Sequence, residues 1–336
     1  MSNAVATACP ACGAPVEPAD DFCEACGARL TAGEQRAPAS FAAGSCSGCG
    51  APPEAIGSDG YCSRCGLRQP SPRDHHEIDL GVTAGVTDRG LRHHRNEDAL
   101  FLKVAGDGTI VAVVCDGVST SIDPDVASQA ATDAAGESLV AAVENHADHL
   151  IDVTRQAIDT AQEAVARVPW TPTDDMAAPA TTFVSAVCQP GTIALGWVGD
   201  SRAYWLGSTS AQRLTVDDSW AEEQVDAGTM TEAEADADPR AHSITRWLGA
   251  DAPTGEWQVT TFTPDGPCRL LLCSDGLWIY APTAAQLAEL LAGQPADASL
   301  LAITRFFTDF ALAGGGHDNI TVVIVDFLTR DRQGGS

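Results

Sequence analysis

The sequence predicts an α+β sandwich, in which two β-sheets lie face to face with helices packed outside them, behind a small cysteine-rich region. Short apolar runs bounded by turn residues alternate with pairs of alanine-rich amphipathic segments. Eight of the twelve cysteines lie within the first 70 residues. The chain has 336 residues, of which 44% are hydrophobic and 19% charged, so it can hold one large globular domain and a small one.

The charge is strongly acidic, with 46 acidic against 19 basic residues and a formal net charge of −27. Such a chain is repelled by nucleic-acid phosphates and by anionic lipid, so we expect neither as a partner. No apolar run reaches the ~20 residues that span a bilayer. The N-terminus lacks the basic and apolar parts of a signal peptide. We therefore expect a cytoplasmic, reducing location, in which the cysteines are thiols or metal ligands.

The cysteine-rich region contains four CxxC pairs, each followed by glycine. In a CxxCG turn the backbone amides point at sulfur, and glycine permits the tight positive-φ geometry. Two pairs together form a closed site of four thiolates, which is typical of structural zinc. Zinc binding would supply most of the folding free energy of such a small unit. A disulfide framework is the alternative.

The pattern resembles the paired zinc ribbons found at the ends of many bacterial proteins. We expect ribbon 1 at residues 1–31 and ribbon 2 at residues 45–70, with linkers at 32–44 and 71–79, and two structural Zn²⁺. Their expected ligands are Cys9, Cys12, Cys23 and Cys26 in ribbon 1, and Cys46, Cys49, Cys62 and Cys65 in ribbon 2.

The main domain is expected over residues 80–328, with a tail at 329–336. Its first block has strands at 82–86, LFLKVA and TIVAVVCDG, with a hairpin turn at 106–108. Residues 125–146 and 150–168 have apolar residues three and four apart, which predicts two amphipathic helices.

The second block repeats this alternation. Apolar runs predict strands at TTFVSAVC, TIALGWVGD, SRAYWL, CRLLLC and residues 319–327, and helices are expected at 283–292 and 299–313. The acidic stretch 217–242 favours helix but has few large apolar residues, so we expect a flap outside the core. The four cysteines in this domain stand in or beside apolar strands and are expected to be small core residues.

Six acids from distant parts of the chain stand at strand ends or in adjoining turns: Glu97, Asp98, Asp116, Asp200, Asp275 and Asp318. Each alone could be a solvated turn residue, but buried together they would repel one another, and divalent cations relieve that repulsion. Oxygen ligands alone favour Mg²⁺ or Mn²⁺, or else Ca²⁺, over zinc or copper. Two such cations ~3.5–4 Å apart activate water and clamp a phosphoryl oxygen, which favours hydrolysis of phosphate esters.

The motifs RNEDA, VCDGVS, TTF, WVGDSRAY, LTVDDS, ITRWLG, LLLCSDGLW and GHDNITVVIV resemble, in order, those of the PPM family of metal-dependent protein phosphatases of the 2C type. The resemblance runs from about residue 80 to 328. It implies a four-layer α-β-β-α sandwich with the metals at one end, between the sheets. It also implies a serine/threonine phosphatase in which a metal-bridging water attacks the phosphate, and phosphoprotein substrates such as those of a serine/threonine kinase. We expect a monomer.

The resemblance also implies roles for the acids around two or three Mn²⁺ or Mg²⁺ ions. Asp116 would bridge two metals, and Gly117 would offer its carbonyl oxygen. Asp275 and Asp318 would complete the shell of the first metal. The second would be held by Glu97 and Asp98, and a third, weaker metal by Asp200 together with Asp275.

The chain departs from the family pattern at two places. Members usually have an arginine five residues before Asp98, where it grips the substrate phosphate, but that position is His93. We expect Arg92, rather than Arg95, to take this role, so the expected catalytic residues are Arg92, Asp98 and Asp116. The alternative is that both arginines are surface bases.

The second departure is that Val118 and Ser119 follow Asp116-Gly117, where some eukaryotic members have a histidine that acts as general acid. A metal-bound water is then the expected proton donor. His94 and His317 are expected to make hydrogen bonds instead of shuttling protons.

Two non-enzymatic hypotheses stand beside the phosphatase. One is a catalytically inactive phosphatase-like module that binds phosphoproteins, and the other is an adaptor whose ribbons bind nucleic acid. The presence of every expected metal-binding acid favours the enzyme.

Overall fold

The computed structural model describes residues 44–327, apart from 58–59, 147–148, 174–175, 208–209, 265 and 267. The chain divides into two compact units, Met1–Gln69 and Pro70–Ser336, which are described separately. The expected ribbon 1, with Cys9, Cys12, Cys23 and Cys26, lies outside the described residues. Within the described part, none of the helices combines the length and the apolar character needed to cross a membrane.

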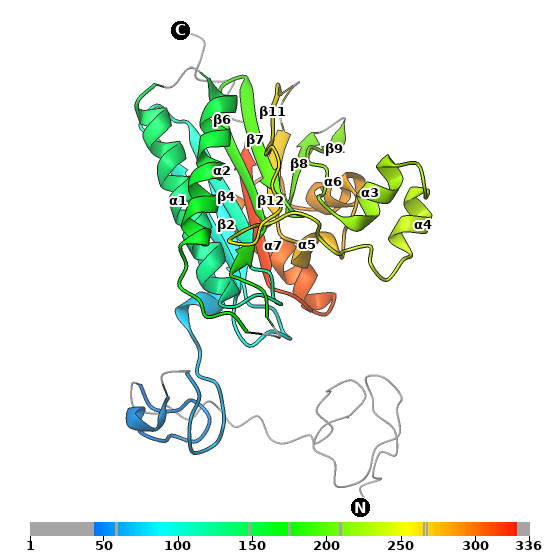
Figure 1. The fold of residues 1–336 in the computed structure, drawn as a ribbon. Helices are drawn as coiled ribbons and strands as arrows, with labels where there is room; N and C mark the ends of the chain where they lie inside the picture. Colours follow the sequence, from blue (N-terminus) through cyan, green and yellow to red (C-terminus); the bar gives the residue numbers. More distant parts are fainter. Residues whose placement is uncertain are drawn as a thin grey trace, which may run out of the picture. The chain divides into compact units, whose positions relative to one another are not determined.

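Two antiparallel sheets form the centre of the larger unit (Figure 1). The first has the order β1 (His75–Asp79), β2 (Thr83–Asp88), β13 (Ile320–Asp326), β12 (Cys268–Cys273), β8 (Arg202–Gly207) and β9 (Ala211–Arg213). The second has the order β11 (Gln258–Phe262), β7 (Thr192–Val198), β6 (Phe183–Gln189), β4 (Ile110–Asp116) and β3 (Asp98–Val104). A short ladder joins β10 (Leu248–Gly249) to β5 (Ala180–Thr181).

Helices cover the outer face of each sheet. On the five-stranded sheet lie α1 (Pro124–Glu144) and α2 (Leu150–Ala166), with small residues such as Ala131 and Ala157 at their buried faces. On the six-stranded sheet lie α5 (Asp275–Trp278), α6 (Ala284–Ala292) and α7 (Leu300–Ala313). The predicted four-layer sandwich is therefore confirmed, and the long helices begin and end within two residues of their expected limits.

The layer between the two sheets is the apolar core of the domain. It contains Val114 and Trp197 from one sheet and Trp205 and Leu270 from the other. The ring of Trp205 packs against Phe262 at 5.0 Å between centroids. The four cysteines of this unit are at most 2% exposed, as predicted, and they are Cys115, Cys188, Cys268 and Cys273.

Residues 217–242 contain two short helices, α3 (Trp220–Asp226) and α4 (Glu232–Asp236), which lie at the side of the sandwich (Figure 1). Ser219 and Thr231 cap their N-termini through side-chain oxygens. A small cluster of alanines with Trp220 packs between them, separate from the main core.

The expected linker at 71–79 is wrong, because most of it is folded. Pro72–Asp74 forms a single 3-10 turn, η2, and β1 pairs along its whole length with β2. The sequence HHEID hides this strand because β1 is an edge strand with one half-buried apolar residue, Ile78. An edge strand needs no alternation of apolar residues when backbone pairing and ion pairs hold it in place. Here Arg305 forms an ion pair with Glu77 of β1. The edge strand β11 was missed for the same reason.

The described part of the smaller unit, residues 44–69, is organised around four thiols. Their sulfur atoms all lie within 4.8 Å of one another: Cys46, Cys49, Cys62 and Cys65. The Sγ atoms of Cys46 and Cys65 are 3.5 Å apart, too far for a disulfide bond. Gly50 and Gly66, which follow the two CxxC pairs, have φ of 68° and 72°, as a CxxCG turn requires.

Candidate active site

The acids expected to hold metal meet at one end of the sandwich, between its two sheets. Asp98 begins β3 and Asp116 ends β4, and the two are directly opposite in the register of that hairpin. Asp275 follows β12, and Asp318 precedes β13, its neighbour in the other sheet. Asp200 lies between β7 and β8. Antiparallel pairing within each sheet and the packing of the two sheets thus bring together residues up to 220 positions apart.

These carboxyl groups raise one another's pKa. Loss of hydration, followed by repulsion from Asp318 and Asp275, raises the pKa of Asp98 to about 7. Loss of hydration and repulsion from Asp318 raise the pKa of Asp275 to about 7. The pKa values of Asp116 and Asp200 are also raised well above their ordinary value, first by loss of hydration and then by the neighbouring acids. A positive charge placed among them would reverse this repulsion.

The residues fit a divalent cation on two further observations. The Oδ1 atoms of Asp98 and Asp275 are buried without a hydrogen-bond partner among the described residues. Buried carboxylate oxygens without donors are available as hard ligands. A Cβ atom at Gly117 would stand 2.4 Å from the carbonyl oxygen of Pro124, so only glycine fits beside Asp116.

The second oxygen of Asp98 is held by two hydroxyl groups. Ser274 and Thr321 donate to Asp98 Oδ2 at 2.8 and 2.7 Å. Thr321 also contacts Thr87 at 2.7 Å, and the Asn96 amide donates to Thr87 at 2.9 Å. This buried chain fixes the orientation of the Asp98 carboxyl group. The sequence motifs contain Ser274 and Thr321 but give no sign of this role.

Glu97 is oriented by a different set of contacts. Ser119 donates to Glu97 Oε2 at 2.6 Å, and Arg95 Nε donates to Oε1 at 3.1 Å. The Glu97 backbone N–H donates to Asn319 Oδ1 at 2.7 Å, while the Asn319 amide donates to the carbonyls of Arg89 and Arg95. Asn319 therefore fixes the loop that leads into β3.

Asp116 is held through its backbone. Its N–H donates to Thr182 Oγ1 at 3.1 Å, and its carbonyl accepts from Thr182 N–H and Thr181 Oγ1, both at 2.8 Å. These bonds fix the backbone that carries the Asp116 carboxylate. The expected motif TTF thus has a structural role that the sequence did not reveal.

Asp200 lies beside a buried ion pair. The guanidinium of Arg202 donates to Asp217 at 2.6 Å and stacks on the ring of Trp278 at 3.5 Å. The indole N–H of Trp278 donates to the carbonyl of Asp200 at 2.9 Å. These contacts fix the turn that carries Asp200 between the two sheets.

The basic residues before Asp98 differ in their surroundings. Arg92 is exposed, whereas Arg95 is paired with Glu97 and, at 3.2 Å, with Asp125. His93, at the position of the family's arginine, lies 3.1 Å from Asp318. Arg95 is thus already engaged by two acids, which leaves Arg92 as the basic side chain that extends into solvent here. His94 and His317 are exposed.

A profile of the family described as protein phosphatase 2C matches residues 90–308, more than half of the chain. The chain belongs to the protein phosphatase 2C family. The matched range begins just before the loop that leads to Glu97 and Asp98 and contains every expected metal-binding acid except Asp318.

Similarity to individual phosphatases agrees with this membership. The serine/threonine phosphatase stp of Listeria innocua is 30% identical over 249 residues, which cover 71% of this chain and 93% of that protein. Among solved structures, the PPM phosphatase of Mycobacterium smegmatis in complex with cacodylate has a TM-score of 0.57 at 28% identity, over 73% of this chain and 97% of that one. The catalytic domain of PstP with two manganese ions has a TM-score of 0.55 at 27% identity, over 73% of this chain and 96% of that one.

These relatives support the enzyme over the inactive binding module. This protein phosphatase 2C chain is a serine/threonine phosphoprotein phosphatase, and it has the sandwich expected from its motifs. The smaller unit, Met1–Gln69, which we call the cysteine unit, lies outside the matched range.

Proposed function

We propose that the chain hydrolyses phosphoserine and phosphothreonine esters of proteins with two or three Mn²⁺ or Mg²⁺ ions. The ions are held by the acid cluster, which consists of Glu97, Asp98, Asp116, Asp200, Asp275 and Asp318. The observation that carries this proposal is the buried carboxyl group with one oxygen unpartnered among the described residues, which occurs at both Asp98 and Asp275. The PstP structure with two manganese ions supports the choice of metal.

The ligand roles follow the family pattern. Asp116 would be shared between two ions, Gly117 would offer its carbonyl oxygen, and Asp275 with Asp318 would complete the shell of the first ion. Glu97 and Asp98 would hold the second ion, and Asp200 a third. When bound, the cations would supply an activated water and neutralise the phosphoryl oxygens.

The protein's own residues orient the reactants. Ser274 and Thr321 hold Asp98 through Oδ2, which leaves Oδ1 without a hydrogen-bond partner among the described residues and available to a cation. Ser119 donates its hydroxyl proton to Glu97, so it is committed as an orienting residue and does not replace the missing histidine as a general acid. Arg92 is exposed and precedes Glu97 by five residues in the sequence. It would bind the substrate phosphate with a bidentate contact.

We further propose structural zinc in the cysteine unit. Around an ion with Zn–S distances of about 2.3 Å, tetrahedral thiolates lie about 3.8 Å apart. The Sγ separations of 3.5 Å for Cys46–Cys65 and 3.7 Å for Cys49–Cys62 fit this geometry. A second zinc in ribbon 1 rests on the sequence pattern alone. The ribbons would serve as docking or regulatory modules.

The proposed setting is a monomer in the cytoplasm that acts on products of a serine/threonine kinase. All eight described cysteines are free thiols, which agrees with a reducing compartment.

Hydrolysis of a phosphothreonine peptide and of p-nitrophenyl phosphate, with Mn²⁺ and with EDTA, tests the proposal. Turnover should require Mn²⁺ and should be lost in Asp275→Asn but retained in Asp107→Asn, whose carboxylate only bonds Thr109 in the β3–β4 turn. Equal turnover in EDTA, or an unaffected Asp275→Asn enzyme, would overturn it.

A further inference from the structure

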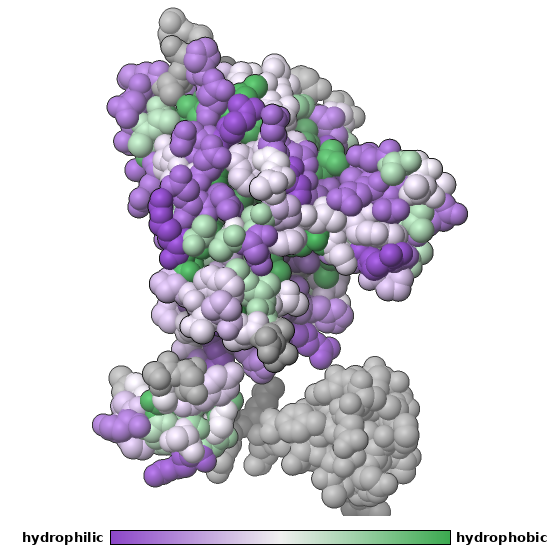
Figure 2. All heavy atoms as spheres, in the orientation of Figure 1, coloured by the Kyte–Doolittle hydropathy of each residue, from purple (hydrophilic) through white to green (hydrophobic). Residues whose placement is uncertain are grey.

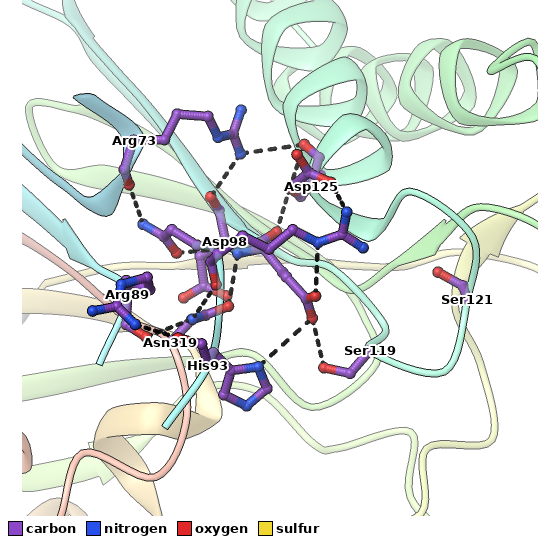
Figure 3. Close-up of polar contacts among 12 residues, drawn as sticks. Arg73, Arg89, His93, Asp98, Ser119, Ser121, Asp125 and Asn319 are labelled. Atoms are coloured by element: carbon purple, nitrogen blue, oxygen red, sulfur yellow. Dashed lines mark hydrogen bonds and ion pairs between the residues drawn. The ribbon is translucent and has the colours of Figure 1, made fainter. Parts of the chain in front are cut away.

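Arg73 lies where the chain enters the phosphatase domain, and its side chain contacts two segments that form the active site (Figure 3). Its Nη2 donates to the carbonyl oxygen of Asp98 and to that of Asp125, both at 3.2 Å. Its Nη1 donates to Gln129 Oε1 at 2.8 Å. One guanidinium therefore joins the first residue of β3 to the first turn of α1.

The backbone around Arg73 makes further contacts to the same region. The Asn96 amide donates to the Arg73 carbonyl at 3.0 Å, one residue before Glu97. Ser71 and Asp74 form a reciprocal capping box that fixes the η2 turn. The N–H of Arg89 donates to the Asp74 carbonyl at 2.8 Å, at the start of the loop that carries Arg92.

The space beside these contacts is not filled by side chains. A cavity of about 230 Å³ is lined by Arg73, Asn96, Asp98 and Gln129, among others. Because the start of β3 borders this pocket on the side of Arg73, the hydrogen bonds of Arg73 contribute to its position. Removal of the guanidinium would enlarge the cavity and leave the Asp98 carbonyl without its donor.

We infer that Arg73 is a positioning residue for the proposed metal-binding acids: it fixes the Glu97-Asp98 start of β3 against α1 and so maintains the affinity for manganese. The inference rests on the proposed function. It assigns a role to a segment that precedes the range matched by the phosphatase family. In the sequence, Pro70, Ser71 and Pro72 separate Arg73 from the first unit, Met1–Gln69.

The test is the Mn²⁺ dissociation constant of the full-length chain, measured without turnover from the electron paramagnetic resonance signal of free Mn²⁺. Arg73→Ala should weaken binding about tenfold, the lower range for the loss of a partner outside the ligand shell. With a phosphothreonine peptide, kcat should fall at low Mn²⁺ and recover at high Mn²⁺, with KM unchanged. Arg73→Lys, which can reach the carbonyls but not Gln129 as well, should lose less.

Arg305→Ala is the matched control, because Arg305 pairs with Glu77 of β1, which belongs to the other sheet from β3. It should bind Mn²⁺ as wild type does. A folded Arg73→Ala chain with wild-type affinity, or an equal loss in Arg305→Ala, would overturn the inference. If Arg73→Ala does not fold, Arg73→Lys and Arg305→Lys give the same comparison. Wild-type turnover that needs no Mn²⁺ would instead overturn the proposed function.

Discussion

The cysteine unit and the phosphatase domain both bring metal ligands together, but they differ in what exists without the metal. Among the described residues of the cysteine unit, only Cys46, Ala51 and Cys62 form its buried cluster, and two of these are proposed zinc ligands. The phosphatase domain has extensive apolar clusters between and outside its sheets. Figure 2 shows the polar surface that covers them on the face in view.

The difference teaches that a metal site can either supply the stability of a fold or reduce it when the metal is absent. A unit with so small a core would depend on the proposed zinc for its folding free energy. The sandwich folds on its apolar core and forces acids together, so its metal site destabilises the metal-free chain. Loss of hydration, and then repulsion from neighbouring acids, raises the pKa values of Asp98 and Asp275.

The largest expected effect is in the cysteine unit. The double change Cys46→Ser and Cys62→Ser should abolish zinc binding at this site and unfold the unit, because about 10 kcal/mol of binding free energy is lost. Zinc analysis and limited proteolysis of residues 44–69 would show this. Turnover of p-nitrophenyl phosphate should remain, and Cys188→Ala, in the core of the other unit, should keep its zinc. Loss of turnover would contradict the separation of the two regions.

The next effect is in the acid cluster, where catalysis and stability should change in opposite directions. Asp116→Asn should lower kcat more than about 100-fold, beyond the loss typical of an outer-shell partner. At pH 8 without metal it should raise the melting temperature, because an amide removes one repelling charge. Calorimetry of the metal-free chain, with Asp107→Asn as the control, measures this. A lower melting temperature would show that repulsion among the acids does not control the stability of the metal-free domain.

A smaller effect is expected from the hydroxyl groups behind the acids. Thr321→Val removes a 2.7 Å hydrogen bond to Asp98 Oδ2 and should weaken Mn²⁺ binding about tenfold. Thr308→Val is the matched control, since Thr308 is equally buried but bonds only to the α7 backbone. Equal affinities in the two variants would remove Thr321 from the site.

The smallest effect is the pH dependence of stability. A carboxyl group whose folded pKa is raised stabilises fully below its unfolded pKa near 4, and that stabilisation is lost as pH rises through about 7. The metal-free melting temperature should therefore fall between pH 5 and pH 8, by a few degrees. Excess Mn²⁺ should cancel the fall because cations favour the ionised acids.

His75 contributes in the same direction. Although loss of hydration opposes it, bonds to Glu77 and Asp88 raise the pKa of His75. The response to Mn²⁺ separates the two sources, because His75 lies at the sheet edge in β1, outside the acid cluster. A metal-free melting temperature that rises from pH 5 to pH 8 would contradict the account of buried repulsion.

The long helices and strands were predictable because burial of one face makes apolar residues recur at regular spacing in the sequence. The helices α2 and α7 have apolar residues three and four apart, and the turn before β4 ends with Gly108 at φ 84°. The edge strands β1 and β11 were missed because one or both of their faces meet solvent, which removes the alternation of apolar residues.

The candidate site was predictable in its acids but not in their supports. Acids at strand ends can be recognised locally, as Asp116-Gly117 can after a run of apolar residues. The bonds from Ser274 and Thr321 to Asp98 join residues 176 and 223 positions apart, and they depend on which strands pair. Arg73 was missed because a polar segment with two prolines reads as a linker.

One metal analysis tests the central contrast most directly. The purified chain, dialysed exhaustively against metal-depleted buffer without chelator and then supplied with Mn²⁺, should retain about two zinc ions per chain, one for each closed four-cysteine site. Turnover should be absent after dialysis and should return in proportion to bound Mn²⁺. Turnover that survives dialysis, or zinc that leaves together with the capacity to bind Mn²⁺, would contradict it.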